Sequence, residues 1–535
     1  MVQGYVSMVL HAHLPYVRHP EYSDCIEERW LFEAITESYI PLIDILDGLI
    51  ADKVDFRLTM SITSTLLSML DDDFLKKRYI EYLHKSIELS EKEVIRTKNI
   101  YQISEVAKMY NNRLNLIMDV YDKRYSRDLI SAFRKFQSMG KLEVLACAAT
   151  HAYLPLMDMY PEAMEAQIKV GIDTYKRYLG CQPHGIWLPE CAYTPAVDRI
   201  LRKYGIYYFI AESHGVLFAQ PRPIYGTYAP IITPQGIAVF GRDAESSKQV
   251  WSADEGYPGD YDYREFYRDI GHELDYDYIK PYIMSDGQRV QTGLKYYRIT
   301  GKTDDKMPYI PERAAEKAAI HAGNFIFNRQ QQISYYSGNM DKPPIAVCPY
   351  DAELFGHWWY EGPKWLDYLM RQVYTSQINF KMITPWEYLN MYPFVQVAQP
   401  CSSSWGYKGY NEVWLNDSND WIYRHLHKAV ERMTEMANRY SSPTDLERRA
   451  LNQAVRELLL AQSSDWAFIM KTGTMTDYAA NRTRAHVQRF NKLYEDIMVG
   501  KIDQQWLSEI EYLDNIFPDI DYRIYSSQNA GAYSN

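Results

Sequence analysis

Seven short apolar runs, each ending in polar or charged residues, limit the folds open to this chain. They span residues 5–13, 55–63, 142–151, 184–190, 206–214, 237–243 and 345–353. Runs that are apolar almost throughout are typical of strands buried on both faces of a parallel sheet. Segments with helical periodicity lie between many of them, at 27–50, 161–179, 194–204 and 309–330. This alternation predicts βαβ units, and seven such runs fit a closed or nearly closed barrel better than an open three-layer sheet.

Two stretches interrupt the alternation, and a third follows it. Residues 72–140 are charged and helical in period, which predicts a helical insertion between the second and third strands. Residues 244–308 are rich in Tyr, Asp and Gly, and they predict a long irregular connection of a kind that is often functional. We therefore expect an α/β fold with a barrel at 1–71 and 141–395, the insertion at 72–140, and a C-terminal all-helical domain at 396–535 that contributes to the cleft.

Charge and hydropathy argue against several classes of protein. The net charge of −11 disfavours nucleic acid as a partner, because phosphate binding needs a basic surface. No run approaches the ~18–20 apolar residues that a membrane span needs, so no membrane partner is expected. The first apolar run has no basic residues before it and predicts a buried strand, not a signal peptide. The six cysteines lack paired metal-ligand spacing, and we expect them to be reduced in a cytoplasmic protein.

Two carboxylates stand where a predicted strand ends and a loop begins. Glu190 ends the run at 184–190, and Asp351 follows the apolar residues from 345 onwards. In β/α barrels this end of the strands carries the chemistry, and cleavage of a glycosidic bond requires two carboxyl groups at one pocket. Glu353 would raise the proton affinity of Asp351 by like-charge repulsion. The alternative for either carboxylate alone is a helix cap or a salt-bridge partner.

Histidines and an arginine belong to the same set of polar residues at strand ends. His11 and His13 alternate along one strand and so point to one face. With His151 and a carboxylate they could bind a metal, or they could donate hydrogen bonds to sugar hydroxyls, and a satisfied core histidine is a third interpretation. Arg242 ends the sixth predicted strand and is a candidate substrate contact.

Aromatic residues are abundant, with 48 Tyr, 17 Phe and 12 Trp. Their flat apolar faces and polar edges suit sugar rings. Trp405, Trp414 and Trp421 lie among Gly and Ser residues, which favours exposed stacking platforms. Asp465 and Trp466 end a helical run, and they could reach the cleft from the helical domain. The alternative for these residues is a seam between domains.

Five motifs resemble the five sequence regions of glycoside hydrolase family 57, in the same order. They are LHAHLPYV (10–17), CAATHAYLPL (147–156), GIWLPECAY (185–193), CPYDAELFGHWWYEGP (348–363) and AQSSDWAF (461–468). The chain looks most like the 1,4-α-glucan branching enzyme subgroup of that family, from residue 5 to about residue 500.

The resemblance implies a (β/α)7 barrel with a helical insertion and a helical C-terminal domain. It also implies retaining transfer within α-1,4-glucans such as amylose or a glycogen-like polymer, with no metal and no organic cofactor. Glu190 matches the nucleophile and Asp351 the general acid/base. The remaining matches are His11, His13 and His151 at the −1 sugar subsite, and Trp30, Trp405, Trp414 and Asp465 at substrate-contacting positions.

Other activities remain open at this point. Within the family the alternatives are an α-amylase and a 4-α-glucanotransferase. In the subgroup a loop tyrosine shields the site from water, and segment 225–250 offers Tyr225 and Tyr228 but no later tyrosine, which favours hydrolysis if neither shields the site. Outside the family the alternatives are a metal-dependent deacetylase or amidohydrolase and a non-catalytic glucan-binding protein.

Overall fold

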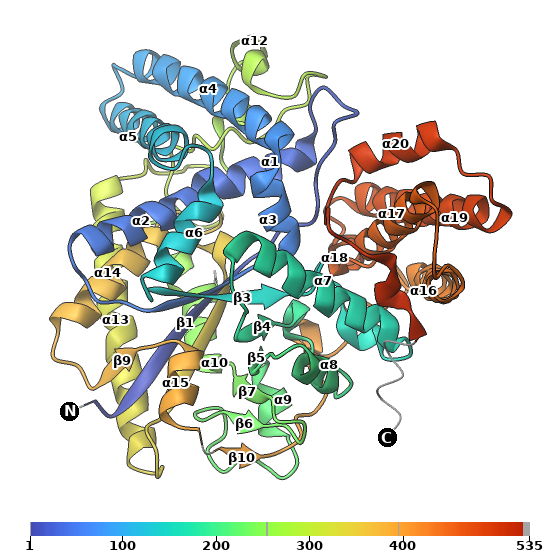
Figure 1. Ribbon diagram of the computed structural model, residues 1–535. Helices are drawn as coiled ribbons and strands as arrows, with labels where there is room; N and C mark the ends of the chain where they lie inside the picture. Colours follow the sequence, from blue (N-terminus) through green and yellow to red (C-terminus); the bar gives the residue numbers. More distant parts are fainter. Residues whose placement is uncertain (1, 253–254, 394, 528–535) are drawn as a thin grey trace.

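Seven parallel strands form the centre of the computed structural model, which describes residues 2–252, 255–393 and 395–527 (Figure 1). The predicted connection at 244–308 and the predicted C-terminal domain therefore each include residues outside the described part. The strands follow the order β8-β1-β2-β3-β4-β5-β7. Their bounds are β1 (Gly4–Ala12), β2 (Leu58–Ile62), β3 (Leu142–Cys147), β4 (Gly185–Trp187), β5 (Tyr208–Ala211), β7 (Ala238–Gly241) and β8 (Ile345–Asp351).

The two ends of this strand order are joined. Arg242, directly after β7, forms a parallel bridge with Val347 of β8, and the Asp243 N–H donates to the Val347 carbonyl oxygen at 2.8 Å. The interior is filled by large side chains of several strands, including Trp187, Tyr208 and Phe240. The strands therefore close into a packed core, and the predicted (β/α)7 barrel is confirmed.

Three short strands extend the sheet. β9 (Phe380–Met382) pairs with the first residues of β1, and β6 (Ile231–Ile232) runs antiparallel to β7 and pairs with β10 (Gln396–Val397) on its other side. These strands lie outside the ring of seven. They leave the C-terminal rim of the barrel free for side chains.

Helices cover the outside of the barrel where the periodicity predicts them. Between β1 and β2 the chain forms α1 (Ile26–Ala34), a π-helix η1 (Ile35–Tyr39) and α2 (Ile40–Ala51). Their apolar face packs Leu42, Ile43 and Leu46 into the main core. The other helices that follow strands are α7 (Pro161–Leu179), α8 (Val197–Lys203), α9 (Ser213–Leu217), α13 (Pro311–Ser337), α14 (Gly362–Thr375) and α15 (Pro385–Met391).

The stretch predicted as an insertion is helical. It contains α4 (Asp73–Arg96), α5 (Tyr101–Met118), η2 (Asp119–Arg124) and α6 (Leu129–Ser138), and α3 (Ser64–Asp71) directly precedes it. The long connection after β7 carries α10 (Ala244–Trp251), α11 (Ile270–Glu273) and α12 (Tyr276–Ile279) and packs against α4 (Figure 1). Tyr278 and Tyr296 of this connection donate to the buried carboxylate of Glu93 at 2.8 and 2.7 Å. Several of the abundant tyrosines therefore satisfy buried carboxylates between segments.

The C-terminal part, residues 421–527, contains helices and no strand among its described residues, whereas the domain predicted to be all-helical began at 396 and therefore includes β10. It comprises α16 (Trp421–Arg439), α17 (Asp445–Ala461), α18 (Ser464–Thr472), α19 (Thr476–Val499) and α20 (Gln504–Leu513). Thr444 and Glu447 form a capping box at the start of α17, which fixes where that helix begins. Ser463, directly before α18, bridges to Ala152 after β3, so the start of α18 lies against the barrel. Among the described helices, none is long and apolar enough to cross a membrane.

Candidate active site

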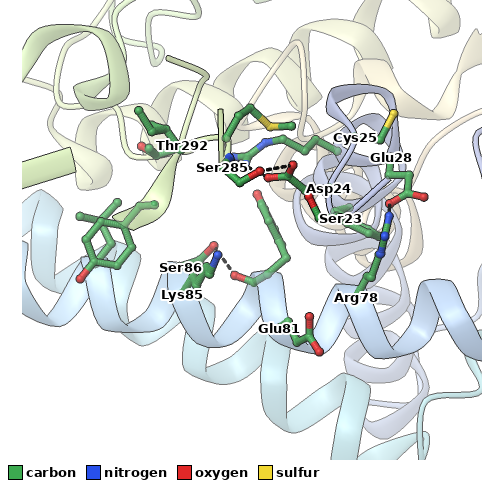
Figure 2. A pocket seen from close by; sticks show the side chains of 17 residues that line it. Ser23, Asp24, Cys25, Glu28, Arg78, Glu81, Lys85, Ser86, Ser285 and Thr292 are labelled. Carbon is green, nitrogen blue, oxygen red and sulfur yellow. Dashed lines mark hydrogen bonds and ion pairs between the residues drawn. The ribbon is translucent and has the colours of Figure 1, made fainter. Parts of the chain in front are cut away.

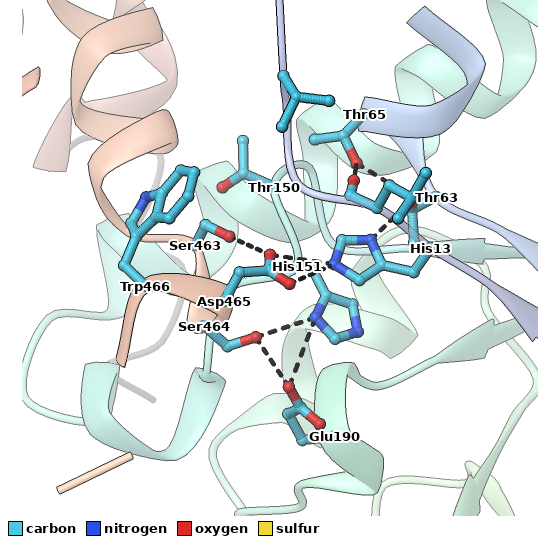
Figure 3. Close-up of polar contacts among 12 residues, drawn as sticks. His13, Thr63, Thr65, Thr150, His151, Glu190, Ser463, Ser464, Asp465 and Trp466 are labelled. Atoms are coloured by element: carbon cyan, nitrogen blue, oxygen red, sulfur yellow. Dashed lines mark hydrogen bonds and ion pairs between the residues drawn. The ribbon is translucent and has the colours of Figure 1, made fainter. Parts of the chain in front are cut away.

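The C-terminal rim of the barrel brings the predicted histidines and carboxylates together, and Figure 3 shows four of them, His13, His151, Glu190 and Asp465. His11 lies near the end of β1 and is aligned with Asp351, the last residue of β8. Aligned residues of neighbouring strands are about 5 Å apart, so these two residues are adjacent. His151 follows β3, and Glu190 lies in the single turn Pro189–Cys191 that follows β4.

Two of these residues have strained backbones. His151 and Glu190 lie in the left-handed region with φ of 57° and 62°, which costs roughly 1–3 kcal/mol for a residue other than glycine. Segments distant in sequence hold both turns. The Ser464 N–H donates to the His151 carbonyl oxygen at 3.1 Å, and the Trp405 N–H donates to the Glu190 carbonyl oxygen at 3.0 Å. The C-terminal part of the chain therefore shapes the barrel rim.

The three histidines form one connected group with Asp465. His11 Nε2 and His151 Nε2 are 3.0 Å apart, and the rings of His13 and His151 stack with centroids 3.8 Å apart. His13 Nε2 lies 3.1 and 3.0 Å from the two carboxylate oxygens of Asp465. Burial lowers the pKa of His13, but the charge and hydrogen bond of Asp465 outweigh it and raise the pKa overall. Burial lowers the pKa of His11 and of His151 well below the usual range, so these two rings are neutral at neutral pH.

Glu190 is held by one donor on each carboxylate oxygen. Trp405 Nε1 donates to Oε2 at 2.8 Å, and Ser464 Oγ donates to Oε1 at 3.0 Å. Burial raises the pKa of Glu190, and the hydrogen bond from Trp405 works in the opposite direction. Two donors in fixed positions orient the carboxylate, as an attacking group requires.

Asp351 is set up to hold a proton. Burial raises its pKa well above the usual range, and the charges of Glu353 and then Glu190 add to the effect. Glu353 is itself held by the His13 N–H at 3.1 Å and by the Tyr39 hydroxyl from η1. Two carboxyl groups that interact through their charges, one favouring the protonated form, provide an acid and an anion in one site.

Arg242 lies at the edge of this group. Its guanidinium donates to Glu212 at 2.9 Å and to Ser247 at 2.7 Å, and it is 5.6 Å from the ring centroids of both Trp251 and Trp405. Trp251 and Trp405 meet edge to face. Arg242 therefore supports an aromatic wall beside Glu190, and its direct contact with substrate stays a prediction.

The other predicted tryptophans differ in exposure. Trp30 is half-buried on α1 and meets Tyr478 edge to face at 5.8 Å. Trp414 is only 1% exposed and stacks on Tyr153 at 4.3 Å, so the expectation of an exposed stacking platform is wrong for this residue. Its indole belongs to the apolar cluster that joins Tyr153 at the barrel rim to Trp466 of α18. Gly406 leaves room for the ring, because a Cβ there would lie 2.6 Å from it. Whether it also influences substrate binding stays a prediction.

Sequence reasoning missed two residues in the site. Ser464 lies in the motif at 461–468, directly before Asp465, which the sequence indicated as a candidate substrate contact. This position was the only feature of the sequence that could have indicated Ser464. Trp251 is 36% exposed beside Trp405, and no motif marked it. Both contacts join residues more than 150 positions apart along the chain.

The donor atoms of the histidine group bear on the metal alternative. Ligand atoms of His13, His151 and Asp465 lie within 4.8 Å of one another, as a metal site requires. However, both ring nitrogens of His13 face protein partners, Thr63 and Asp465, and both of His151 face His11 and Ser464. A metal ion would have to displace these contacts, and the raised pKa of His13 favours its protonated form, which cannot act as a ligand.

A separate pocket of about 220 Å³ lies away from this rim (Figure 2). Residues before and within α1, residues of α4 and the segment 282–292 line it, with Asp24 accepting a hydrogen bond from the Ser285 hydroxyl at 2.7 Å. Arg78 pairs with Glu28 across it. Its charged groups are mostly engaged with one another, and neither Glu190 nor Asp351 lines it.

Comparisons with known proteins agree with this geometry. The model of glycosyl hydrolase family 57 matches residues 7–401, and the model of the 1,4-alpha-glucan branching enzyme C-terminal domain matches residues 425–525. The 1,4-alpha-glucan branching enzyme TK1436 of Thermococcus kodakarensis is 33% identical over 99% of this chain and 79% of its own length.

Two solved structures are similar over almost the whole chain. The alpha-amylase AmyC from Thermotoga maritima is 46% identical, with a TM-score of 0.92 over 98% of this chain and 99% of its own. The branching enzyme from Pyrococcus horikoshii is 34% identical, with a TM-score of 0.89 over 98% of this chain and 97% of its own. The chain belongs to glycosyl hydrolase family 57.

Proposed function

We propose that this protein is a 1,4-α-glucan branching enzyme that acts by a retaining mechanism. The observation on which this depends most is the pair formed by Glu190, oriented by two hydrogen-bond donors, and Asp351, whose pKa burial raises well above the usual range. Retaining transfer needs one anionic attacker and one protonated acid at the same sugar. Branching enzymes and an α-amylase among the similar proteins support α-glucan as the substrate class.

The first half-reaction forms a glycosyl-enzyme. A carboxylate oxygen of Glu190 attacks the anomeric carbon while the bond between that carbon and the glycosidic oxygen breaks. Asp351 gives its proton to the glycosidic oxygen, which leaves as the 4-hydroxyl of the released fragment. In the second half-reaction the Asp351 carboxylate takes a proton from the 6-hydroxyl of an acceptor chain. That oxygen attacks the anomeric carbon and frees Glu190, which creates an α-1,6 branch.

The surrounding groups fit binding of the sugar at the reacting position. The stacked histidines present a flat polar surface beside Glu190, and the Trp405 ring lies on the other side of the carboxylate. We assign His11, His13, His151 and Asp465 to the sugar that reacts, and Trp30, Arg242, Trp405 and Trp414 to substrate binding or to its support.

Analysis of the products made from amylose tests the proposal. Branching lowers iodine staining without an equal rise in reducing ends, and isoamylase then releases new short chains. A rise in reducing ends with no isoamylase-sensitive product would refute branching and leave hydrolysis. The Glu190→Gln variant separates enzyme from binding protein, because a non-catalytic glucan binder would be unaffected by that change.

An α-amylase is the second candidate, and a specific observation favours it. The tyrosines of segment 225–250 lie at the far end of the barrel from Asp351. The Tyr228 carbonyl accepts from Ile345, the first residue of β8, while the Tyr228 ring stacks on Tyr336 at 3.6 Å. Tyr225 lies beside Lys342, before the same strand. Neither tyrosine covers Glu190, so water has better access to the glycosyl-enzyme if no other group shields it.

The arrangement of domains and the compartment belong to the same proposal. We place the barrel at 1–71 and 141–395, the helical insertion at 72–140 and the helical domain at 396–535, with α18 reaching into the site. All six cysteines lie in the described part of the chain and none is paired in a disulfide, which supports a reducing, cytoplasmic setting.

A further inference from the structure

A line of hydrogen bonds runs from the barrel interior to Glu190. His11 Nε2 lies 3.0 Å from His151 Nε2, His151 Nδ1 lies 2.9 Å from Ser464 Oγ, and Ser464 Oγ lies 3.0 Å from Glu190 Oε1. Figure 3 shows the last two of these contacts. His151 Nδ1 itself is 3.8 Å from Glu190 Oε1, beyond hydrogen-bond distance. The serine hydroxyl therefore connects the histidine to the carboxylate.

We propose that His11, His151 and Ser464 form a hydrogen-bond relay of a single polarity, in which each group donates to the next and the last hydrogen bond is accepted by Glu190. Ser464 is then the positioning residue through which the C-terminal helical domain orients the nucleophile. The inference rests on the proposed function, because it takes Glu190 as the attacking group. It adds Ser464 to the site as a residue that acts through Glu190.

Proton counting sets the polarity. An ionised carboxylate only accepts, so the single hydroxyl proton of Ser464 points to Glu190. Ser464 Oγ must then accept from His151, which places the ring proton of His151 on Nδ1. A neutral imidazole carries one ring proton, so His151 Nε2 accepts, and His11 donates from its own Nε2. The opposite polarity would turn the lone pairs of Ser464 towards the carboxylate.

The same polarity serves both half-reactions. When one oxygen of Glu190 becomes part of the glycosyl ester, the other becomes a carbonyl oxygen and still accepts hydrogen bonds. Trp405 and Ser464 donate to different oxygens, so whichever oxygen attacks, one donor stays on the carbonyl oxygen of the ester, and no proton has to move along the relay. The carboxylate is thus held in place before, during and after attack, which reduces the reorganisation that the reaction needs.

The backbone supports the assignment of Ser464. Its N–H holds the strained turn at His151, at 3.1 Å from the carbonyl oxygen, and its side chain holds Glu190, whose own backbone is strained. Ser464 is 2% exposed and is the first residue of α18. Packing of α18 against the barrel therefore positions the Ser464 hydroxyl beside Glu190 and also holds the strained turn at His151.

Nuclear magnetic resonance of the resting enzyme tests the polarity without any turnover. In protein labelled with 15N histidine, the shifts of the two ring nitrogens distinguish the Nδ1–H from the Nε2–H tautomer, and the His11→Gln and His151→Gln variants assign the signals. At neutral pH we expect His151 in the Nδ1–H form and His11 in the Nε2–H form. An Nε2–H tautomer at His151 would overturn the relay whatever the enzyme's activity.

Kinetics test the positioning role. With an α-maltosyl fluoride, fluoride release follows formation of the glycosyl-enzyme, and Ser464→Ala should lower kcat/KM for this step about 10- to 100-fold, the effect of losing one hydrogen bond to a charged group. Ser464→Thr, which retains the hydroxyl, should recover most of the rate. Thr472→Ala is the matched control, because among the described residues this exposed hydroxyl on α18 forms hydrogen bonds to Ile469 of its own helix and to Thr474 alone.

The pH profile separates positioning from a purely structural effect. The Ser464 hydrogen bond lowers the pKa of Glu190, so Ser464→Ala should move the acid limb of kcat/KM to higher pH. Asp465, His13, His151 and Asp351 also face Glu190, and all four remain in this variant. A Ser464→Ala enzyme that folds and keeps the wild-type rate and acid limb refutes the role of Ser464. A Glu190→Gln enzyme that still releases fluoride at the wild-type rate refutes the proposed function instead.

Discussion

Replacement of Asp465 by Asn removes the ion pair that connects α18 to the end of β1. Asp465 accepts from His13 Nε2 through both carboxylate oxygens, at 3.1 and 3.0 Å, and the two side chains are 16% and 11% exposed. Burial by itself raises the pKa of Asp465, but the charge of His13 and the hydrogen bond to it lower the pKa from 3.8 to about 2. At about 1.4 kcal/mol per pKa unit, ionised Asp465 contributes about 2 kcal/mol to stability.

The pH range in which the Asp465–His13 pair stabilises the protein follows from the pKa shifts of the two residues. Asp465 has a lowered pKa, so its contribution is present above pH 3.8 and is lost as the pH falls through about 2. His13 has a raised pKa, so its side of the same pair is fully present below pH 6.5 and is lost as the pH rises through the raised value. Because this is one interaction seen from two partners, the energy counts once. The destabilisation of Asp465→Asn should therefore be largest between about pH 4 and pH 6.5.

Thermal unfolding across pH measures the effect. For a chain of 535 residues that unfolds as a whole, about 2 kcal/mol lowers Tm by about 2 °C. We expect that difference from wild type at pH 5 to 6 and a smaller one at pH 9 to 10. Asp417→Asn is the control, because Asp417 is an exposed aspartate in the same C-terminal part of the chain. A Tm difference that is the same at pH 5 and pH 10, or none at pH 5, would refute the reasoning.

Four further predictions concern the site. Glu190→Gln should lower transfer and hydrolysis by several orders of magnitude with Tm nearly unchanged, and a residual rate within tenfold of wild type would contradict its assignment as nucleophile. Asp351→Asn should impair reaction with amylose far more than fluoride release from an α-maltosyl fluoride, because fluoride leaves without a general acid; equal losses would argue against the acid role. Trp414→Ala should destabilise the protein by about 3–5 kcal/mol, measured by unfolding, because the indole is buried; an effect on KM alone would make it a surface contact. EDTA should leave activity unchanged, because the ring nitrogens of His13 and His151 already have protein partners; loss restored by zinc would favour the metal-dependent alternative.

Strand positions were predictable because burial on both faces leaves a direct mark on composition. Every apolar run from 5–13 to 345–353 contains a strand of the barrel. The positions of Glu190 and Asp351 followed from the same pattern, because polar residues can interrupt such a run only where the strand leaves the core. The amphipathic helices after the strands were predictable for a similar local reason, since one face of each packs on the sheet.

Contacts between distant segments were not predictable from those patterns. Trp414 lies among Gly and Ser residues, as an exposed ring would, yet Tyr153 and the seam at α18 cover it. In the sequence Ser464 is marked only by its place in the motif at 461–468, and packing brings its hydroxyl between His151 and Glu190. Neither the composition nor the spacing of these segments records which surface the helical domain packs against.

The amino-acid sequence by itself determined the barrel strands, the helical segments and the two carboxylates, because each depends on hydrophobic periodicity within about ten residues. Only the tertiary structure decided the left-handed turns at His151 and Glu190, the ion pair between His13 and Asp465, and the serine that reaches the nucleophile. These features exist because packing brings segments hundreds of residues apart within hydrogen-bond distance, and the backbone strain at the rim is sustained by those same contacts.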